Sequence, residues 1–367
     1  MRRDYIDIGY SPKETDLVCE FHIEPTAGVN FEEAATHLAG GESSIDSWTE
    51  IATLSPELAE KLKPPHVFYA DEGAQTIRVA YSEELFELGS VPQVLSAVAG
   101  NILSMKIVDN VRLQDIAFPK SMINEFKGPN FGLPGGIRKL VGVQDRPLIG
   151  TIVKPKVGLN SEKHAEVAYN SFVGGCDLVK DDENLSDQKF NSFEKRAELT
   201  LKLAEKAESE TGEKKMYLCN VTAPPTCREM IRRMNFLKDL GASYVMVDIV
   251  PAGWTAIQTL REEAEDAGLA LHAHRCMHSA YTRNPRHGIS MLVVAKLCRL
   301  IGLDQLHIGT VVGKMHGEKH EVLNLRDQCV LDKVPADESQ HILAQDWGGI
   351  KANVPCSIRR SRSYNDP

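Results

Sequence analysis

A short run of charged residues, Lys180-Asp181-Asp182-Glu183, is the first place in this sequence where side chains could do chemistry. The run follows the mostly apolar residues 175–179, which are typical of a buried strand. Three carboxylates directly after a strand repel one another unless a cation lies among them, and carboxylate oxygens suit Mg²⁺. The lysine fits such a site if its amine is neutralised, for instance by adding CO₂ to form an anionic carbamate. The alternative is a solvated acidic turn, and the rest of the sequence must decide between the two.

Charged and imidazole side chains also follow the other apolar runs of the sequence. Carboxylates at such positions suit a metal ion, and cations suit an anionic substrate, most simply a phosphorylated one. Taken singly, each could be a surface or structural side chain, so their shared position is what favours a site. In chain order they are Lys154 and Lys156, which flank Pro155, then Asn220, Asp248, His272, His274, Arg275, His278 and His307.

Two other interpretations of these motifs are weaker. His272, His274 and His278 could bind zinc, but their spacing fits no common zinc pattern. The segment from Gly309 to Lys314 is similar to a phosphate-binding P-loop, yet it is one residue short and a methionine replaces the Mg²⁺-binding Ser or Thr. A glycine-hinged lid that carries Lys314 over the site fits this segment better.

Strand-like and helix-like patterns alternate after residue 147. This alternation predicts parallel βα units, about six of them, in an α/β fold with a (β/α)8 barrel of the TIM type; the family resemblance given below implies that this barrel is incomplete at its C-terminal end. An open doubly wound sheet is less favoured, because the glycine-rich phosphate loop after its first strand is absent. The predicted strands are 148–153, 177–179, 216–221, 244–250, 269–273 and 305–308, and the predicted helices are 162–172, 193–209, 226–240, 254–267 and 289–301.

The first third of the chain has a different pattern of predicted strands and helices. Strands are predicted at 16–22 and 76–79 and helices at 30–38 and 91–100, with Pro92 in a first helical turn, which indicates a small α+β domain. The Gly- and Pro-rich residues 127–136 are typical of a loop. The predicted division is an N-terminal domain at 1–126, a linker at 127–147, the barrel at 148–355 and an aberrant basic tail at 356–367.

Composition narrows the possible functions. The chain has 367 residues, of which 42% are apolar, so it can bury a large core. Its net charge of −9 argues against broad binding to nucleic acids or anionic membranes. The longest apolar run, at 291–298, is too short to span a membrane. Eight cysteines without a CxxC pair indicate reduced thiols in a cytoplasm.

Together these motifs resemble the large subunit of ribulose-1,5-bisphosphate carboxylase/oxygenase, and among its branches the archaeal form III most closely. The resemblance covers the chain from about residue 10 to residue 355. In the barrel it rests on Ile152-Val153-Lys154-Pro155-Lys156, Gly174-Gly175-Cys176-Asp177, Lys180-Asp181-Asp182-Glu183, His274-Arg275-Cys276-Met277-His278, residues 307–314, Gly317-Glu318 and Gln345-Asp346-Trp347. In the first domain it rests on Glu42-Ser43-Ser44, Ser47-Trp48-Thr49 and Gly100-Asn101.

The resemblance implies a ferredoxin-like first domain, a barrel, and one Mg²⁺ per site. The substrates would be ribulose 1,5-bisphosphate with CO₂ or O₂, and carboxylation would yield 3-phosphoglycerate in nucleotide-ribose salvage. Lys180 would be the carbamylated base, and Asp182 and Glu183 would complete the Mg²⁺ ligands. The remaining implied roles are acid/base chemistry by a buried Lys154 beside Lys156, proton transfer by His274, phosphate binding by Arg275 and His307, stabilisation of the new carboxylate by Lys314, substrate contacts by Ser47 and Trp48, and contributions of Glu42 and Asn101 from the partner subunit of an obligate homodimer, often assembled further.

The last residues of the sequence depart from the family pattern. Val354-Pro355 begins a seventh strand, but residues 356–367 lack the glycine loops that hold phosphate in the family, and they look like a shifted reading frame. An unclosed barrel without these loops predicts an insoluble or inactive product, with activity restored by a family-like segment after Pro355. Four doublets, each one residue longer than the family pattern, are Gly40-Gly41, Pro64-Pro65, Gly135-Gly136 and Pro224-Pro225.

Two other functions stay open at this point. One is a carboxylase-like enolase or isomerase that acts on a methylthio-sugar phosphate, which the joint presence of Lys154, Arg275, His307 and Lys314 disfavours. The other is a non-catalytic truncated relative, for which the missing glycine loops are the evidence. Carboxylation of ribulose bisphosphate is the leading hypothesis.

Overall fold

The structure is a computed structural model that describes residues 5–42, 44, 55, 57, 63–311 and 317–357, with the backbone alone at residues 41 and 42. The described residues divide into two compact units, and each unit takes in more than one stretch of the chain. Unit 1 contains the described parts of Met1–Phe126 together with His278–Leu297 and Leu331–Ile350. Unit 2 contains Lys127–Met277 and the described parts of Cys298–Val330 and Lys351–Pro367. The domain boundaries given above stay a prediction.

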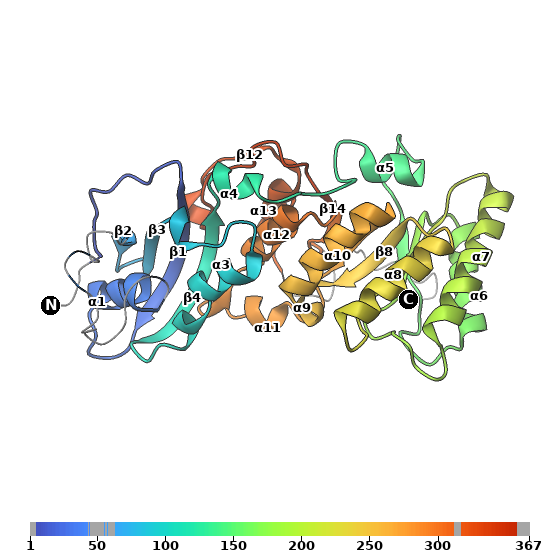
Figure 1. Ribbon diagram of the computed structural model, residues 1–367, viewed down its shortest axis with the longest axis horizontal. Coiled ribbons are helices and arrows are strands. Elements are labelled where there is room, and N and C mark those ends of the chain that lie inside the picture. Colours follow the sequence, from blue (N-terminus) through green and yellow to red (C-terminus); the bar gives the residue numbers. More distant parts are fainter. Residues whose placement is uncertain are drawn as a thin grey trace, which may run out of the picture. The chain divides into compact units, whose positions relative to one another are not determined.

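The described residues of unit 1 form a five-stranded sheet in the order β10-β4-β1-β3-β2. Strands β1 to β4 of this sheet are labelled in Figure 1. β1 pairs antiparallel with β3 and β4, and the short β10 joins β4 in parallel. Every second residue of β1, namely Leu17, Cys19, Phe21 and Ile23, is fully buried, so one face of the sheet packs into the core of this unit. The strands are β1 (Asp16–Pro25), β2 (His66–Asp71), β3 (Thr76–Ser82), β4 (Val108–Ala117) and β10 (Gly288–Ile289).

Helices complete unit 1 and confirm the α+β prediction. α1 (Phe31–Thr36) contacts β1 and β2, and its first turn is capped by the side chain of Asn30. α3 (Val91–Val98) carries Pro92 in its first turn, as predicted. The other elements are η1 (His37–Glu42), η2 (Glu83–Leu85), η3 (Asn101–Ser104), α4 (Lys120–Asn124), α11 (Ser279–Thr282), β12 (Lys333–Val334), η4 (Glu338–Gln340) and β13 (Gln345–Asp346).

In unit 2 the described strands form a seven-stranded parallel sheet in the order β14-β11-β9-β8-β7-β6-β5. The sheet curls into a half-barrel. Helices α6, α7, α8 and α10 lie along its outer side (Figure 1). The prediction of an incomplete TIM-type barrel is therefore confirmed. In chain order the elements are α5 (Gly136–Val141), β5 (Gly150–Ile152), α6 (Ser161–Val173), β6 (Leu178–Lys180), α7 (Phe193–Thr211), β7 (Met216–Asn220), α8 (Cys227–Asp239), β8 (Tyr244–Asp248), α9 (Ile249–Ala252), α10 (Trp254–Ala267), β9 (Ala270–His274), β11 (Gln305–His307), α13 (Lys319–Val330) and β14 (Val354–Cys356). α12 (Met291–Ile301) is divided between the units, with its residues up to Leu297 in unit 1 and the rest in unit 2.

The inner side of the half-barrel changes from apolar to polar along the strands. The residues at the strand starts, among them Leu178, Met216 and Tyr244, form an apolar cluster with Ile137 and Val141 of α5. This cluster closes the amino-terminal end of the half-barrel. Polar side chains therefore gather at the carboxyl ends of the strands, where active sites lie in barrels of this type.

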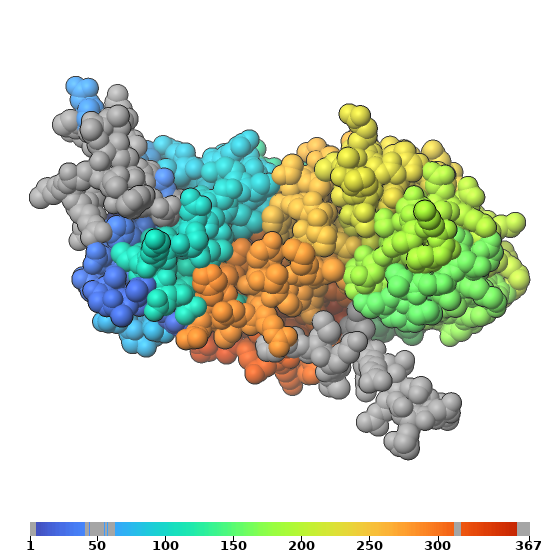
Figure 2. All heavy atoms as spheres, turned by 90° about the horizontal axis from the view of Figure 1, so that it is seen from below, coloured from blue at the N-terminus to red at the C-terminus, as the bar shows by residue number. Residues whose placement is uncertain are grey.

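The pair α6 and α7 shows how the outer layer is held. The hydroxyl of Tyr169 on α6 donates a hydrogen bond to Glu210 Oε2 on α7 at 2.5 Å, and the Lys206 amine lies 4.7 Å from the centre of the Tyr169 ring. Figure 2 shows the green side chains of these helices lying together on the surface of unit 2. The buried face of this pair covers the outer side of β6 and β7.

The apolar run at 244–250 is not extended to its end. β8 ends at Asp248, the residue expected to end this strand, and the short helix α9 begins at Ile249. Pro251 lies in the first turn of α9, where its missing N–H costs no helical hydrogen bond. β2, β4 and α13 were not predicted; in β4 the charged Asp115 obscures the apolar alternation, and it is buried because Lys296 pairs with it. No helix among the described residues is long and apolar enough to cross a membrane.

Candidate functional site

The candidate site lies at the carboxyl ends of the parallel strands of unit 2. Parallel strands place their carboxyl ends on the same rim, so side chains that are far apart in sequence meet there. The structure brings most of the sequence-predicted residues of the barrel to this rim. They are Lys154 and Lys156 after β5, Lys180, Asp182 and Glu183 at the end of β6, His274 and Arg275 at the end of β9, and His307 at the end of β11.

Two lysines neutralise the two carboxylates that follow β6. Lys154 donates to Asp182 Oδ2, and the Lys156 amine lies 2.6 Å from Glu183 Oε1 and 3.3 Å from Asp182 Oδ1. The hydrogen bond to Glu183 raises the pKa of Lys156 above its ordinary value. Lys154 was expected to be buried, and this is wrong, because 53% of its side chain is exposed. Its partner Asp182 is buried, so the pair lies at the boundary between the protein interior and solvent.

The Lys180 side chain is buried in the middle of this group. Its amine donates to the carbonyl oxygen of Asp181 at 2.8 Å and lies 3.1 Å from the sulfur of Met246. Burial lowers the pKa of Lys180, although the carboxylates of Asp248 and Asp182 oppose this effect. Burial therefore makes loss of the amine proton, which gives the nucleophilic form of a lysine, easier than in an exposed lysine.

Asp181 does not join the other two carboxylates. It is fully buried on the outer side of the half-barrel, because neighbouring residues of an extended chain point to opposite faces. The expectation that three acids face one another after β6 is therefore wrong. Burial raises the pKa of Asp181, but its cationic and hydrogen-bonding neighbours outweigh this and keep it below the ordinary value. Those neighbours are Arg196 (Nε at 3.3 Å), His164 (Nε2 at 3.1 Å), Tyr217 (hydroxyl at 2.5 Å) and the backbone N–H of Asn220 (3.1 Å).

A carboxylate orients His274. Its Nδ1 lies 2.7 Å from Asp248 Oδ1, and its Nε2 lies 4.0 Å from Glu183 Oε2. The other oxygen of Asp248 accepts hydrogen bonds from Asn220 Nδ2 at 3.0 Å and from the Thr222 hydroxyl at 3.2 Å. Sequence reasoning noted Asp248 and Asn220 as strand ends and gave them no role. Their position at the carboxyl ends of two adjacent strands was the signal that could have assigned them.

Three more residues of the rim lie at the end of β11 or just after β9 and β11. The ring of His307 is buried and packs edge-on against His274, with 5.5 Å between ring centroids. The guanidinium of Arg275 lies directly over Gly309, where a Cβ atom would approach it to 2.9 Å. Gly309 also has φ +100°, so the backbone conformation and the space at this position both require glycine. Arg275 and His307 thus follow adjacent strands, as a shared anion site would require.

His272 lies deeper, below this rim. Its Nδ1 lies 2.5 Å from Gln305 Oε1. The same oxygen accepts a hydrogen bond from the Tyr244 hydroxyl at 2.9 Å. Burial lowers the pKa of His272 to about 3, so the ring is neutral. His278 belongs to unit 1, where its Nδ1 lies 2.8 Å from the Thr282 hydroxyl.

The remaining predicted residues lie elsewhere. Asn101 is an exposed residue of unit 1 at the start of η3. Glu42 ends η1, and its side chain is not among those that the structure describes. Ser47, Trp48 and Lys314 lie outside the described residues. Their assigned roles stay predictions.

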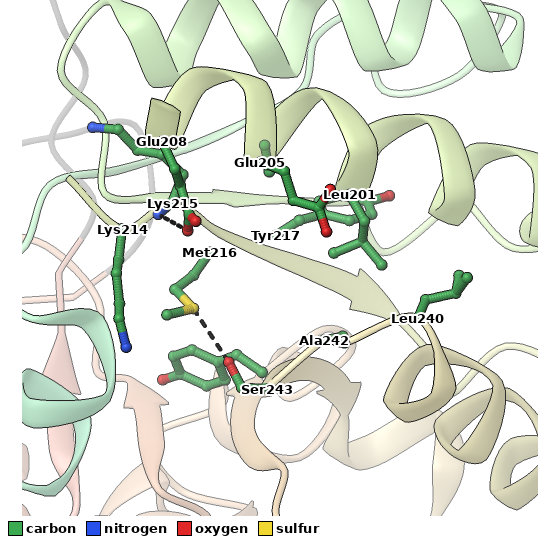
Figure 3. Close-up of a pocket in the computed structure, with 13 residues that line it drawn as sticks. Leu201, Glu205, Glu208, Lys214, Lys215, Met216, Tyr217, Leu240, Ala242 and Ser243 are labelled. Atoms are coloured by element: carbon green, nitrogen blue, oxygen red, sulfur yellow. Dashed lines mark hydrogen bonds between the residues drawn. The ribbon is translucent and has the colours of Figure 1, made fainter. Parts of the chain in front are cut away.

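A separate hollow of about 240 Å³ lies at the opposite end of β7 and β8 (Figure 3). Leu201, Glu205 and Glu208 of α7 line one side of it, and Met216 and Ser243 line the other. Two of its polar contacts are internal: the Lys215 N–H donates to Glu208 Oε1 at 2.8 Å, and Ser243 donates to the Met216 sulfur. None of the residues predicted for the site lines this hollow.

The curled parallel sheet and its rim define a TIM-type barrel protein with a polar centre of lysines, carboxylates and imidazoles. Family models for the ribulose bisphosphate carboxylase large chain match the sequence, the N-terminal domain over residues 4–122 and the catalytic domain over residues 135–358. The chain belongs to this family. The resemblance seen in the sequence is thereby confirmed.

Named relatives agree with this assignment. Over 355 residues the chain is 97% identical to the ribulose bisphosphate carboxylase of Methanosarcina mazei, which covers 97% of this chain and 82% of the relative. The enzyme of the same name from Methanocaldococcus jannaschii is 48% identical over 360 residues, covering 96% of this chain and 83% of the relative.

Solved structures give the same fold. The dimeric archaeal Rubisco from Hyperthermus butylicus superposes with a TM-score of 0.89 at 40% identity, covering 96% of this chain and 81% of that one. The octameric Rubisco from Pyrococcus horikoshii gives a TM-score of 0.86 at 43% identity, with coverage of 97% and 79%.

Proposed function

We propose that this chain is the large chain of an archaeal form III ribulose 1,5-bisphosphate carboxylase, which adds CO₂ to its substrate and yields 3-phosphoglycerate in nucleotide-ribose salvage. One observation carries the proposal: a buried lysine amine, Lys180, lies beside two lysine-neutralised carboxylates, Asp182 and Glu183, at the carboxyl ends of barrel strands. The names of the relatives support the carboxylase rather than the sugar-phosphate isomerase.

Mg²⁺ is the metal that these residues would hold. Among the described side chains, no three His, Cys, Asp or Glu groups are arranged as a ready metal site. The oxygens of Asp182 and Glu183 suit Mg²⁺ by type, and a carbamate on Lys180 would add the further anionic oxygen that the set lacks. Bound Mg²⁺ would supply Lewis-acid polarisation of substrate oxygens. The donor set therefore fits the metal once Lys180 is modified.

Lys180 gains that oxygen by reaction with CO₂. The neutral amine forms a bond from Nζ to the carbon of CO₂, one C=O electron pair moves onto oxygen, and the nitrogen releases one proton to solvent. The product is an anionic carbamate, and burial of the amine favours the neutral form that this step needs. The carbamate then removes the C3 proton of the bisphosphate to form the enediol.

The other residues act on the substrate. Lys154 and His274 transfer protons, with His274 oriented by Asp248. Arg275 and His307 bind one phosphate group, and charge-assisted hydrogen bonds of this kind are the strong ones. Further substrate contacts come from Lys156, Ser47 and Trp48, while Lys314 stabilises the carboxylate formed by CO₂ addition.

A second copy of the chain completes the site. Glu42 and Asn101 reach the substrate from the partner subunit, so the working unit is a homodimer or a larger assembly of dimers. The dimeric and octameric relatives support this arrangement. The protein acts in the cytoplasm, where its eight cysteines stay reduced.

Incorporation of ¹⁴CO₂ into acid-stable product in the presence of Mg²⁺ and ribulose bisphosphate tests the proposal. Lys180→Arg should abolish incorporation, because arginine stays cationic and forms no carbamate. Lys189→Arg, at an exposed position in the loop after β6, is the matched control and should leave incorporation unchanged.

The assay is run on two chains. One is the 367-residue chain, and the other carries the corresponding segment of the Methanosarcina mazei relative after Pro355. The comparison also tests the prediction drawn above from residues 356–367. Absence of incorporation by both soluble chains would refute the proposed function.

A further inference from the structure

At the end of β6, the side chains of the candidate ligands and that of Asp181 point to opposite sides of the half-barrel. Lys180 and Asp182 point to the inner side of the half-barrel, where they meet Met246 and Lys154. Asp181, between them in sequence, points to the outer side. Its carboxylate is therefore attached to the same short stretch of backbone as the two groups that would hold the metal.

The outer carboxylate is held from several directions. Arg196 of α7 and His164 of α6 contact it, and the Tyr217 hydroxyl of β7 donates to it at 2.5 Å. All three partner side chains are buried. Two helices and the neighbouring strand thus fix one carboxylate.

The same residue is tied to the inner side through its backbone. The Asp181 N–H donates to the Leu218 carbonyl at 3.1 Å, and the Asp181 carbonyl accepts from the Lys180 amine at 2.8 Å. The carboxylate also accepts the N–H of Asn220 at 3.1 Å. Asn220 in turn donates to Asp248, which orients His274. A shift of Asp181 would therefore move the Lys180 amine and the end of β7 together.

We propose that Asp181 is a positioning residue: anchored by Arg196 and Tyr217 on the outer side of the half-barrel, it holds the end of β6 so that Lys180 and Asp182 face the metal position. This inference rests on the proposed function, because the groups it positions are the carbamate and the Mg²⁺ ligand. Asp181 itself touches neither substrate nor metal.

A purely structural role is the competing explanation, and the chain offers a matched control for it. Asp177, just before β6, is also fully buried and is paired with an arginine, with Arg146 nitrogens 2.6 and 2.7 Å from its two carboxylate oxygens. Asp177→Asn and Asp181→Asn make the same chemical change at the two ends of one strand. Asp177 lies at the end away from the candidate site.

The test measures the CO₂ adduct rather than turnover. The full chain is equilibrated with ¹³CO₂ and Mg²⁺, and the carbamate carbon is followed by ¹³C NMR, assigned by its loss in Lys180→Arg. Asp181→Asn should raise the half-saturating CO₂ concentration about 10- to 100-fold, the usual effect of removing a group that orients a metal ligand. Asp177→Asn should keep the half-saturating concentration of the unmodified chain, even though its unfolding midpoint falls.

Each outcome decides between the explanations. If Asp181→Asn is folded by circular dichroism and saturates like the unmodified chain, Asp181 positions nothing. If it fails to fold, Tyr217→Phe replaces it, since this change removes one donor and leaves the Arg196 pair; unchanged saturation by Tyr217→Phe would overturn the inference. A lack of any Lys180-dependent signal in the folded, unmodified chain would instead overturn the proposed function, and the inference with it.

Discussion

Replacing Asp248 by asparagine should uncouple His274 from the rest of the site. The carboxylate of Asp248 is buried and accepts hydrogen bonds from His274, Asn220 and Thr222. An asparagine side chain has one oxygen and one NH₂ group, so it cannot accept from all three. If its oxygen faces His274, its NH₂ opposes the NH₂ of Asn220; if it is turned, the NH₂ forces His274 into the other tautomer.

Either arrangement should have a measurable effect on stability and on the rate of proton exchange. Losing a charge-assisted hydrogen bond from a buried group costs about 1.5–3 kcal/mol in free energy of unfolding, measured by urea denaturation. Proton transfer by a misoriented histidine should fall about 100- to 10,000-fold, the usual contribution of general acid–base catalysis. The assay is exchange of the C3 proton of ribulose bisphosphate, followed by NMR in D₂O.

Thr222→Val is the matched control for this change. It removes the hydroxyl that contacts the Asp248 carboxylate and accepts the Asp248 N–H, and it leaves the carboxylate on His274, so it should lower stability and retain most of the exchange rate. The reasoning is refuted if Asp248→Asn exchanges the proton as fast as Thr222→Val.

Three further predictions concern other parts of the chain. Gly309→Ala should weaken binding of a bisphosphate at the site, measured by calorimetry, because the new methyl group lies 2.9 Å from the Arg275 guanidinium and forces the backbone out of φ +100°; binding unchanged from that of the unmodified chain would contradict this. The hydrogen bond from His341 to Glu20 raises the pKa of His341 above 6.5, so its contribution is complete below that pH and is lost as the pH rises through the raised value. His341→Asn should therefore destabilise the protein more at about pH 5.5 than at about pH 8.5 in urea unfolding, and an equal effect at both would count against the pairing. Lys314→Met should retain C3 proton exchange and lose ¹⁴CO₂ incorporation, because the carboxylate that it stabilises does not exist before CO₂ adds; equal loss of both would make it a general binding residue.

The barrel and the composition of its rim could be predicted from the sequence because both follow from local patterns. The apolar run before Lys180 and the charges after it specify a strand and its carboxyl end, and the parallel topology then brings that end next to Asn220 and Asp248. The limit of this reasoning is shown by residues 244–250, where the apolar pattern continues past Asp248 although the chain turns into α9.

The direction in which a side chain points and the extent to which it is buried could not be predicted, since both depend on residues far away in the sequence. Asp181 looked like a third site carboxylate until its partners on α6 and α7, His164 and Arg196, fixed it on the outer side. Both partners lie in helices that read as amphipathic, where a buried arginine is indistinguishable from an exposed one without its contacts. Lys154 likewise looked buried from its neighbours in sequence, whereas 53% of its side chain is exposed.

The charges of the site give a reason for modifying Lys180 and binding Mg²⁺ together. Around the end of β6, the carboxylates of Asp182 and Glu183 already have Lys154 and Lys156 as partners. Converting a Lys180 ammonium to a carbamate changes its charge from +1 to −1, and one Mg²⁺ restores those two units. Either event alone would leave an uncompensated charge in a buried position, which is costly. We therefore expect the carbamate and the metal to stabilise each other, so that raising Mg²⁺ lowers the CO₂ concentration needed for half-saturation in the ¹³C experiment; half-saturation independent of Mg²⁺ would show that the two events are not coupled.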